Sequence, residues 1–505
     1  MAIKLEKIKL ASAAEIKELP HEELISLTLK LIERMEYYQG LLYRAKNDKF
    51  GSKSEKSPKN PDEKQEGDDG AAQANPKEKC PRADTTKRPS ERYPDAPIKE
   101  NLIGFTEPPC CEACGHKMEN SGMTEDSEYL STSPKEYIII RQKRQKHRCT
   151  KCHSSIVTAP SPPRIVPGGT YGDDMIVDAT LSKFCDLIPM ERYCQMAARR
   201  GLLGLPPQSL IEASINLSKF MEPVYQRIKD QTLNYIVMSA DETPHKMLEG
   251  DEKKRWFLWG FSSVRSCFFE CHDTRSGDVS TAVLAKSNCE FLLTDVYSGY
   301  DKSVRLANQL RLLEGRPLIL HAYCNAHARR KFKERDSDQV CEDAESMVNH
   351  YKEIYKLNKE SKGEPVEVVL EKRAKMKPIF ETMKDEALAK INSYSSKSQM
   401  AIAYNYFLEN YEGLTRFLDN EQIPIDNNHS ERILRSHVIG RKTWYGTHST
   451  RSAESAAIHF SIVETCKMIG VNPREFYLDA VARIHSKRES LTPFEYKELT
   501  DTNTG

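Results

Sequence analysis

Three acidic residues stand where a divalent-cation site could form. Asp241 follows the apolar run IVMSA and Asp295 follows FLLT, and both runs are typical of buried strands. Glu431 lies farther along, at the start of a helical stretch in DNNHSERILR. Two aspartates at strand ends and a glutamate on a later helix can hold two divalent cations about 4 Å apart, as two-metal phosphoryl transfer requires. The pattern therefore predicts chemistry on phosphodiesters.

Each of these residues also has a purely structural explanation. Asp241 could cap a turn and Asp295 could cap a helix, because carboxylates accept hydrogen bonds from free backbone N–H groups. Glu431 could pair with Arg435, one helical turn later. Their joint occurrence in the order strand, strand, helix favours the site of an RNase H-like nuclease over three separate structural roles. Two neighbouring carboxylates serve as comparisons for any mutational test: Glu242 and Asp426.

Basic residues lie close to the acidic positions in sequence. The whole chain carries 75 Lys and Arg against 74 Asp and Glu, a net charge of +1, so binding to a polyanion would depend on local patches. One such patch is RQKRQKHR, from Arg141 to Arg148. The residues that we expect to contact DNA lie in two further patches, HARRKFK and the segment after the glutamate: Arg329, Arg330, Lys331, Arg432, Arg435, Arg441 and Lys442. A solvated helix face is the alternative explanation for each patch.

The cysteine spacing indicates a zinc site. Of the 14 cysteines, four form two C-x-x-C pairs: Cys111, Cys114, Cys149 and Cys152. Two such pairs supply four thiolates to one tetrahedral Zn²⁺, and the long interval between them favours a structural zinc ribbon over a compact finger. The N-terminus lacks the uninterrupted apolar segment of a signal peptide, and no segment approaches the ~18 apolar residues of a membrane span. We therefore expect a protein of the bacterial cytosol, with reduced or metal-bound cysteines and no membrane partner.

Two smaller groups have roles that the sequence leaves open. His321, Cys324 and His327 are spaced three residues apart in HAYCNAHARRKF. This spacing allows a metal site, although packing or hydrogen bonding at a strand-to-helix junction is the expected role. Trp444 and Tyr445 could stack on a DNA base, with packing in the core as the alternative.

The elements that position the acidic residues begin near Tyr235. Four apolar runs in quick succession, YIVMSAD, RWFLWGFS, RSCFFECHD and EFLLTDVY, are typical of strands, and LILHAYC follows after a helical stretch. Consecutive short strands, then a helix and another strand, predict a mixed α/β sheet. The Lys- and Glu-rich segment 336–420 predicts a helical insertion before the glutamate, and the chain stays helical from there to about His485.

We expect seven regions along the chain. The heptad spacing of Leu24, Leu31 and Tyr38 predicts a coiled-coil-like N-terminal helix, and the Lys-, Glu-, Pro- and Gly-rich segment after it predicts a disordered linker. The regions are a leucine-zipper-like helix at 1–50, a linker at 51–100, a zinc-binding domain at 101–160, a helical DNA-binding-like region at 161–230, a catalytic domain at 231–440, a C-terminal helical region at 441–490 and a tail at 491–505. For the region at 161–230, packing of its helices on the catalytic core is the alternative to DNA reading.

Several long motifs resemble those of transposases of the insertion sequence 66 family. The similar segments are the N-terminal helix ending in KFGSKSEK, the two cysteine pairs, SADETPHKML, TDVYSGY, CNAHARRKF, DNNHSERILRSHVIGRKTWYGTHS and SIVETCKMIGVNP. The resemblance runs nearly from end to end. It implies a DDE triad of Asp241, Asp295 and Glu431 on an RNase H-like fold with a helical insertion. Val296 stands where the family pattern has glycine, but its side chain need not touch a metal.

The resemblance also implies the reaction. Two Mg²⁺ ions, or Mn²⁺ in their place, would be held by the triad while the enzyme cleaves at terminal inverted repeats and joins the 3′-OH ends to target DNA. Synapsis of two ends implies a homo-oligomer, and the family implies two small accessory proteins of the same element. Three alternatives stay open: a transposase-derived DNA-binding protein that does not cut, an RNase H-like nuclease that does not join strands, and a tyrosine recombinase that uses Tyr445.

Overall fold

The computed structural model describes residues 89–92, 135–148, 156–248, 255–336 and 341–503. The predicted N-terminal helix, most of the predicted linker and all four cysteines of the predicted zinc site lie outside these residues. The chain divides into two compact units. The larger includes Pro160–Gln195 and Leu205–Gly505, and the smaller combines Gln73–Ala159 with Met196–Gly204.

The smaller unit contains a short antiparallel pair of strands. β1 (Lys146–Arg148) pairs with β2 (Ile156–Thr158), and the N–H of Ala159 donates to the carbonyl of Gln145 at 2.9 Å. A single helical turn, α3 (Pro89–Arg92), precedes the strands in the chain. The second predicted C-x-x-C pair falls between the two strands, outside the described residues.

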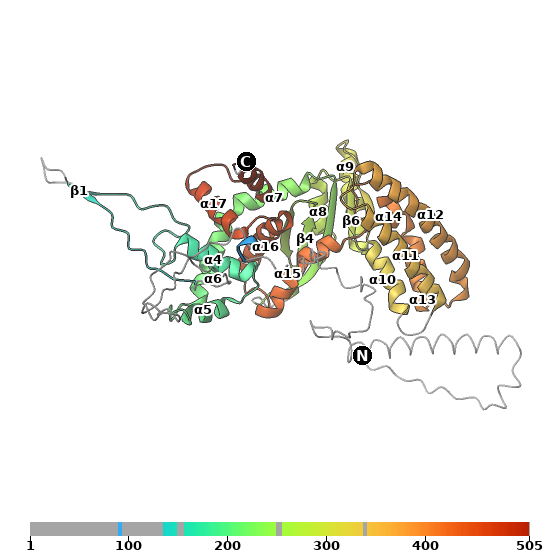
Figure 1. Ribbon diagram of the computed structural model, residues 1–505, viewed down its shortest axis with the longest axis horizontal. Coiled ribbons are helices and arrows are strands. Elements are labelled where there is room, and N and C mark those ends of the chain that lie inside the picture. Colours follow the sequence, from blue (N-terminus) through green and yellow to red (C-terminus); the bar gives the residue numbers. More distant parts are fainter. Residues whose placement is uncertain (1–88, 93–134, 149–155, 249–254, 337–340, 504–505) are drawn as a thin grey trace, which may run out of the picture. The chain divides into compact units, whose positions relative to one another are not determined.

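A five-stranded mixed sheet lies in the larger unit (Figure 1). Its strands, in chain order, are β3 (Val237–Lys246), β4 (Arg255–Ser262), β5 (Cys267–His272), β6 (Phe291–Thr294) and β7 (Leu320–Tyr323). Their order across the sheet is β5-β4-β3-β6-β7; β3, β4 and β5 are antiparallel, whereas β6 and β7 run parallel to β3. The predicted mixed α/β sheet is therefore confirmed.

The pairing of β3 with β6 fixes which side chains share a face of the sheet. Met238 pairs with Leu292, and Ser239 pairs with Leu293. Met238 and Leu292 belong to the largest apolar core, whereas Leu293 packs in the separate core of the helices that follow β7. Because side chains alternate along a strand, Asp241 lies on the same face as Ser239, away from the largest core.

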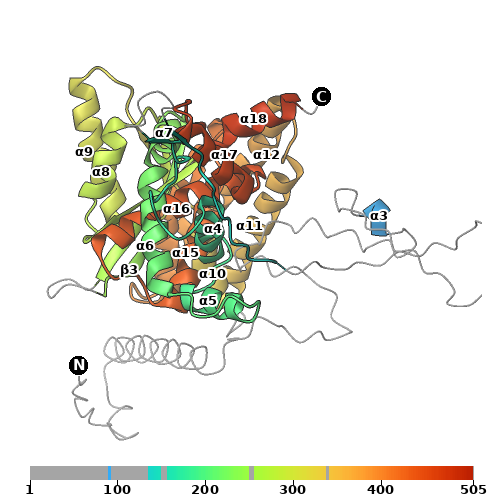
Figure 2. The same cartoon turned by 90° about the vertical axis from the view of Figure 1, so that its left-hand side faces the viewer.

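Two helices lie beside the parallel strands. α8 (Asp278–Lys286) precedes β6, and α9 (Ser298–Leu313) links β6 to β7. The two helices lie side by side (Figure 2). Buried Arg311 of α9 donates to the carbonyls of Cys289 at 2.7 Å and Pro317 at 3.0 Å, so a single side chain fixes the loops that lead into β6 and β7.

Helices that precede β3 in the chain pack together with helices near the C-terminus. They are α4 (Asp173–Phe184), α5 (Met190–Ala198), α6 (Pro207–Phe220), α7 (Glu222–Leu233), α16 (Thr450–Ile469) and α17 (Pro473–His485). α16 is buried on almost all sides and contacts α4, α6, α7 and β5. His459 of α16 donates through Nε2 to the carbonyl of Ser214 on α6 at 3.0 Å. The sequence leaves two roles open for the region 161–230, DNA binding and packing of its helices on the core. These contacts favour packing for much of the region.

The end of the chain differs from the predicted tail at 491–505. A helix, α18 (Pro493–Asn503), begins there. Its start carries a capping box, in which the N–H of Glu495 donates to Thr492 Oγ1 at 3.3 Å and the N–H of Thr492 donates to the Glu495 carboxylate at 2.7 Å. The prediction of a tail is wrong because TPFE is a helix start signal of the T-x-x-E type.

Most of the interval predicted as a helical insertion, 336–420, is helical (Figure 1). The helices after β7 are α10 (Asn325–Asp336), α11 (Glu342–Glu360), α12 (Val366–Lys390), α13 (Gln399–Glu409) and α14 (Tyr411–Thr415), with 3-10 turns η1 (Ile391–Ser393) and η2 (Arg416–Asp419). They share an apolar core that includes Tyr351, Phe380 and Phe407. α15 (Asn428–Trp444) then returns the chain to the sheet and packs on β3 and β4. No helix among the described residues is long and apolar enough to cross a membrane.

Candidate active site

Asp241 and Asp295 follow equivalent points on neighbouring strands. Ser239 of β3 pairs with Leu293 of β6, and each aspartate comes two residues after its member of this pair. Side chains two residues apart on a strand share a face. The pairing therefore brings the two carboxylates to neighbouring positions at the carboxyl end of β6.

Glu431 reaches the same place from the first turn of α15. Two polar contacts hold this turn to the sheet. Asn427 Nδ2 donates to the carbonyl of Ala240 at 3.1 Å, and the hydroxyl oxygens of Ser430 and Ser262 are 2.7 Å apart. Since Ala240 directly precedes the first aspartate, the start of α15 is fixed beside it.

Glu431 lies close enough to both aspartates to act on their pKa values. Burial and the negative charges of neighbouring carboxylates, Asp295 and Glu431 among them, raise the pKa of Asp241 well above its ordinary value. Burial and the same kind of repulsion raise the pKa of Asp295 to about 6. Burial also raises the pKa of Glu431, an effect that Arg330 and Arg435 partly offset. The predicted triad thus forms one cluster with an excess of negative charge, which is suited to a divalent cation.

The two comparison carboxylates are paired with neighbouring groups. Glu242 accepts a hydrogen bond from the Tyr300 hydroxyl at 2.5 Å and binds the Arg275 guanidinium at 2.6 Å, and its side chain is only 3% exposed. Asp426 accepts a hydrogen bond from the Tyr355 hydroxyl at 3.0 Å. Both residues therefore have hydrogen-bond partners that support a structural role.

Comparison with known proteins places this site within a recognised family. The sequence model of the transposase IS66 family matches residues 168–455, a range that contains all three acidic residues. The chain belongs to the IS66 transposase family. Two relatives from Sinorhizobium fredii (strain NBRC 101917 / NGR234) carry only the description of uncharacterized proteins. One, y4hP, is 25% identical over 447 residues, which cover 83% of this chain and 79% of the relative. The other, y4jD, is 26% identical over 405 residues, which cover 77% of this chain and 78% of the relative.

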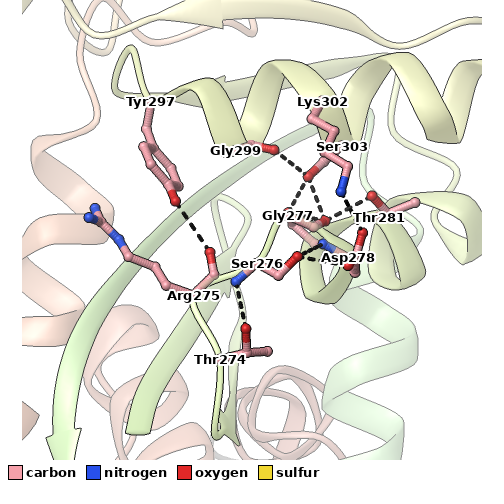
Figure 3. A network of polar contacts seen from close by, with 11 residues as sticks. Thr274, Arg275, Ser276, Gly277, Asp278, Thr281, Tyr297, Gly299, Lys302 and Ser303 are labelled. Atoms are coloured by element: carbon pink, nitrogen blue, oxygen red, sulfur yellow. Dashed lines mark hydrogen bonds and ion pairs between the residues drawn. The ribbon is translucent and has the colours of Figure 1, made fainter. Parts of the chain in front are cut away.

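In this IS66-family chain a network of polar contacts holds the loop between β5 and α8 against the first turn of α9 (Figure 3). The Ser303 hydroxyl donates to the carbonyl of Gly277 at 2.7 Å. Lys302 binds the Asp278 carboxylate at 3.0 Å. A Cβ atom on Gly277 would lie 2.4 Å from the carbonyl oxygen of Gly299, so this close approach requires glycine. The network therefore fixes the whole loop.

Arg275 lies in this loop, and the sequence analysis missed it. Its guanidinium lies 4.3 Å from the centre of the Tyr297 ring, and the Tyr297 hydroxyl donates to its carbonyl at 3.3 Å (Figure 3). Its positive charge acts against the rise in the pKa of Asp295. The side chain is 49% exposed, so the guanidinium keeps access to solvent beside the acidic cluster. The sequence signal is weak, because DTRSGD is typical of many polar loops.

Several of the predicted DNA-contacting residues retain exposed surface on α10 and α15. They are Arg330, Arg432, Arg435, Arg441 and Lys442. Arg330 and Arg435 are exposed and lie near enough to Glu431 to act on its pKa. Lys442 is exposed in the last turn of α15. The two helices that meet at the third carboxylate therefore carry a set of surface cations.

Arg329 and Lys331 of α10 lie against aromatic rings instead. Arg329 is 9% exposed, and its guanidinium lies 5.3 Å from the centre of the Tyr355 ring. The Lys331 ammonium lies 4.6 Å from the centre of the Tyr406 ring. Such cation–π contacts stabilise the packing of helices. The prediction of a DNA contact at Arg329 needs correction, since a buried guanidinium cannot reach the DNA backbone.

The two aromatic residues at the end of α15 have different surroundings. Trp444 packs edge-on against Phe184, with ring centroids 6.3 Å apart. Tyr445 is 72% exposed and ends the helix in the left-handed conformation, with φ of 67°. Core packing therefore accounts for Trp444, whereas the Tyr445 ring lies at the surface.

His321 is separated from Cys324 and His327 by its own partners. His321 Nε2 lies 2.8 Å from Thr294 Oγ1, and its Nδ1 lies 2.9 Å from the Asp301 carboxylate. The expected hydrogen-bonding role therefore fits His321. Cys324 and His327 lie beside the third carboxylate of the triad instead.

Proposed function

We propose that this protein is a DDE transposase that cleaves at the terminal inverted repeats of an insertion sequence and joins the 3′-OH ends to target DNA. Its membership of the IS66 transposase family supports this class of reaction. The observation that carries the proposal is the convergence of Asp241, Asp295 and Glu431 from two strands and a helix. We infer that the mixed sheet is an RNase H-like core and that the helices after β7 are its insertion.

The triad suits divalent cations in both charge and donor type. Negative charge gathers where burial already disfavours it, and Arg275 and Arg330 offset only part of the effect, since the pKa values of Asp295 and Glu431 stay raised. Carboxylate ligands suit Mg²⁺ or Mn²⁺. Two such ions, when bound, would lower the pKa of the attacking water and stabilise the leaving 3′ oxygen. The contribution of the chain is to fix the three carboxylates on rigid elements before DNA arrives.

Surface cations around the triad would hold the DNA strand. Arg330, Arg435 and Lys442 present positive charge on the two helices that meet at the glutamate. Contacts of this kind to phosphates fix the register and orientation of the nucleic acid without reading its sequence. Exposed Tyr445 could stack on an unpaired base at the transposon end, since aromatic side chains bind bases of any sequence in this way.

Three further parts of the proposal rest on the sequence. We propose that Cys111, Cys114, Cys149 and Cys152 bind one structural zinc ion. The N-terminal helix would mediate the homo-oligomer that brings two transposon ends together. Two small accessory proteins of the same element would take part in the reaction.

The proposal can be tested by cleavage and joining of a labelled duplex that carries the terminal repeat of the element. Wild type is compared with Asp295→Asn, with Mg²⁺ and with EDTA, in the presence of the accessory proteins. We expect metal-dependent nicking at the end and strand transfer, both lost in the variant. Specific binding without cutting would favour a DNA-binding protein, and cutting without joining would favour a nuclease.

A further inference from the structure

Cys324 lies at the junction of β7 and α10, directly beside the acidic cluster. It is fully buried. One potential ligand atom from each of Cys324, His327 and Glu431 lies within 4.8 Å of the other two. The distance from His327 Nε2 to Glu431 Oε1 is 3.6 Å, longer than a hydrogen bond. The three side chains therefore face a common point without being bonded to one another.

Burial and the nearby carboxylates of Asp426 and Glu431 raise the pKa of the Cys324 thiol to about 12, and two backbone donors offset part of this rise. The Cys324 Sγ accepts a hydrogen bond from the N–H of Asn427 at 3.2 Å and another from the backbone N–H of His327. It also stands at the N-terminus of α10, where the helix dipole favours negative charge. Amide donors and a helix N-terminus are the devices that stabilise the thiolates of metal-binding cysteines.

The other two side chains have unused capacity for a ligand. His327 Nδ1 and Glu431 Oε1 are buried and have no hydrogen-bond partner among the described residues. Buried polar atoms without a partner are rare, and an ion is one of their explanations. Asp426, which lies close to this group, has its carboxylate occupied by the Tyr355 hydroxyl. One of the two unpartnered atoms, Glu431 Oε1, lies 3.6 Å from the imidazole of His327.

We propose that Cys324, His327 and Glu431 bind a transition-metal ion, and that Zn²⁺ fits the set best. Thiolate, imidazole and carboxylate are the three ligand types of zinc sites in proteins, and a site with three protein ligands leaves a fourth position for water. Mg²⁺, by contrast, prefers oxygen ligands alone. The thiolate and the carboxylate together balance the charge of the ion. On binding, the Cys324 thiol releases its proton to solvent and a sulfur–metal bond forms.

This site would share Glu431 with the Mg²⁺ ions of the proposed function. A zinc ion held by Cys324 would engage an oxygen that the transposase centre needs. Zinc would therefore inhibit the Mg²⁺-dependent reaction, and this consequence alone depends on the proposed function. Metal binding itself is measured without DNA, so a failure of the zinc site and a failure of the transposase proposal are distinguishable.

The test is the zinc content of the full-length protein after loading with Zn²⁺ and removal of free metal. Wild type is compared with Cys324→Ser, which keeps a hydrogen-bond acceptor for Asn427, and with His327→Asn. We expect each variant to hold one zinc ion fewer per chain than wild type. Loss of a direct ligand should weaken binding by more than the ~10–100-fold that loss of an outer partner causes. With Co²⁺ as the probe, the sulfur-to-metal absorption band of wild type should decrease in Cys324→Ser.

Cys289→Ser is the matched control, because Cys289 is also fully buried but lies in the loop before β6. It should keep the zinc content and the cobalt spectrum of wild type. The cysteine pairs near the N-terminus are present in all of these proteins, so the differences report only on the internal site. Equal zinc content in wild type, Cys324→Ser and His327→Asn would overturn the proposal. An equal loss in the Cys289→Ser control would overturn it too, since the effect would then not be specific to the site.

Discussion

The acidic cluster and the helical insertion both contain buried charged groups, but in the insertion these groups have hydrogen-bond partners in the surrounding chain. In the insertion, buried Arg373 of α12 donates to four backbone carbonyls of the segment 417–423. Asp343 accepts hydrogen bonds from Lys390 and Tyr394, each at 2.6 Å. Burial alone would raise the pKa of Asp343, yet these partners bring it below its ordinary value. Charge in this region holds the fold together.

At the acidic cluster the balance is reversed. The pKa values of Asp241, Asp295 and Glu431 are all raised. Burial raises each of them, neighbouring carboxylates add to the rise at the two aspartates, and arginines offset only part of it at Asp295 and Glu431. A fold does not gain stability from such an arrangement, since burying like charges together is unfavourable. Buried charge that is hydrogen-bonded by the surrounding chain therefore indicates structure, whereas buried like charges placed side by side indicate a site that awaits a ligand. The predictions below test this distinction.

The largest effect is expected from Asp295→Asn. The change removes a proposed metal ligand, so cleavage should fall by more than the ~100-fold upper range for loss of an outer-shell partner. Thermal stability without metal should stay the same or rise, because one repulsive charge is gone. The measurements are end cleavage with Mg²⁺ and the midpoint of thermal unfolding. Asp230→Asn, which changes an exposed aspartate of α7, is the control and should retain activity. A variant with full activity would remove Asp295 from the site.

Arg373→Met should give the opposite result in the insertion. Several carbonyl groups lose their donor, and the free energy of unfolding should fall by about 3 kcal/mol. Urea unfolding measures the change. Lys375→Met on the same helix is the control; its salt bridge to Glu371 is exposed, so stability should hardly change. If Arg373→Met were as stable as the control, the contrast between the two regions would fail.

The pH dependence of stability should separate the regions as well. Asp295 has an ordinary pKa of 3.8 and a pKa of about 6 in the folded protein. Between these two pH values the folded state keeps a proton on Asp295 that the unfolded state has released. Protonated Asp295 therefore stabilises the folded state relative to its charged form, and this stabilisation is lost as pH rises from about 4 to about 6. Without metal, the melting temperature of wild type should therefore fall relative to that of Asp295→Asn as pH rises over this interval. Above about pH 6, added Mg²⁺ should raise the melting temperature of wild type again. Asp343, with a lowered pKa, contributes stability that is lost only in acid. Parallel pH profiles of wild type and Asp295→Asn would contradict the assignment.

The smallest effect is expected from Lys442→Met. If Lys442 neutralises one phosphate, its loss should make the slope of log affinity for DNA against log salt concentration less negative by about 0.9. Binding measured at several salt concentrations gives the slope. Lys375→Met, a surface lysine of the insertion, should leave the slope unchanged. An equal change of slope in both variants would mean that Lys442 acts only through the net charge of the protein and does not contact a phosphate.

The sheet and the triad could be predicted because their signals are local. Apolar runs that end in a carboxylate are visible in a few residues, and Asp241 and Asp295 lie directly after such runs. Long motifs then linked these positions to a family. Glu431 needed the helical stretch around it as well, but that stretch is also continuous in sequence.

Other parts depend on contacts between distant segments, and the sequence could not supply them. The three-residue spacing of His321, Cys324 and His327 suggested one group, yet His321 belongs to a strand and bonds to Asp301. The third member of the group with Cys324 and His327 is instead Glu431, which lies on a helix far along the chain. Burial of Arg329 follows from the face of α10 that packs on the insertion, and a run of basic residues does not reveal that face. The helix start at TPFE, by contrast, was a local signal that went unused.

The most direct test of the central claim is metal rescue of the triad. Asp241→Cys, Asp295→Cys and Glu431→Cys each replace a carboxylate by a softer thiolate ligand, which disfavours Mg²⁺ and accepts softer ions better. End cleavage is measured with Mg²⁺ and with Mn²⁺, with Asp230→Cys on the exposed face of α7 as the control. We expect each of the three variants to lose cleavage with Mg²⁺ and to regain part of it with Mn²⁺, while the control is active with both. Cleavage at the wild-type level with Mg²⁺ in any of the three variants would contradict the claim that these carboxylates form one cation site.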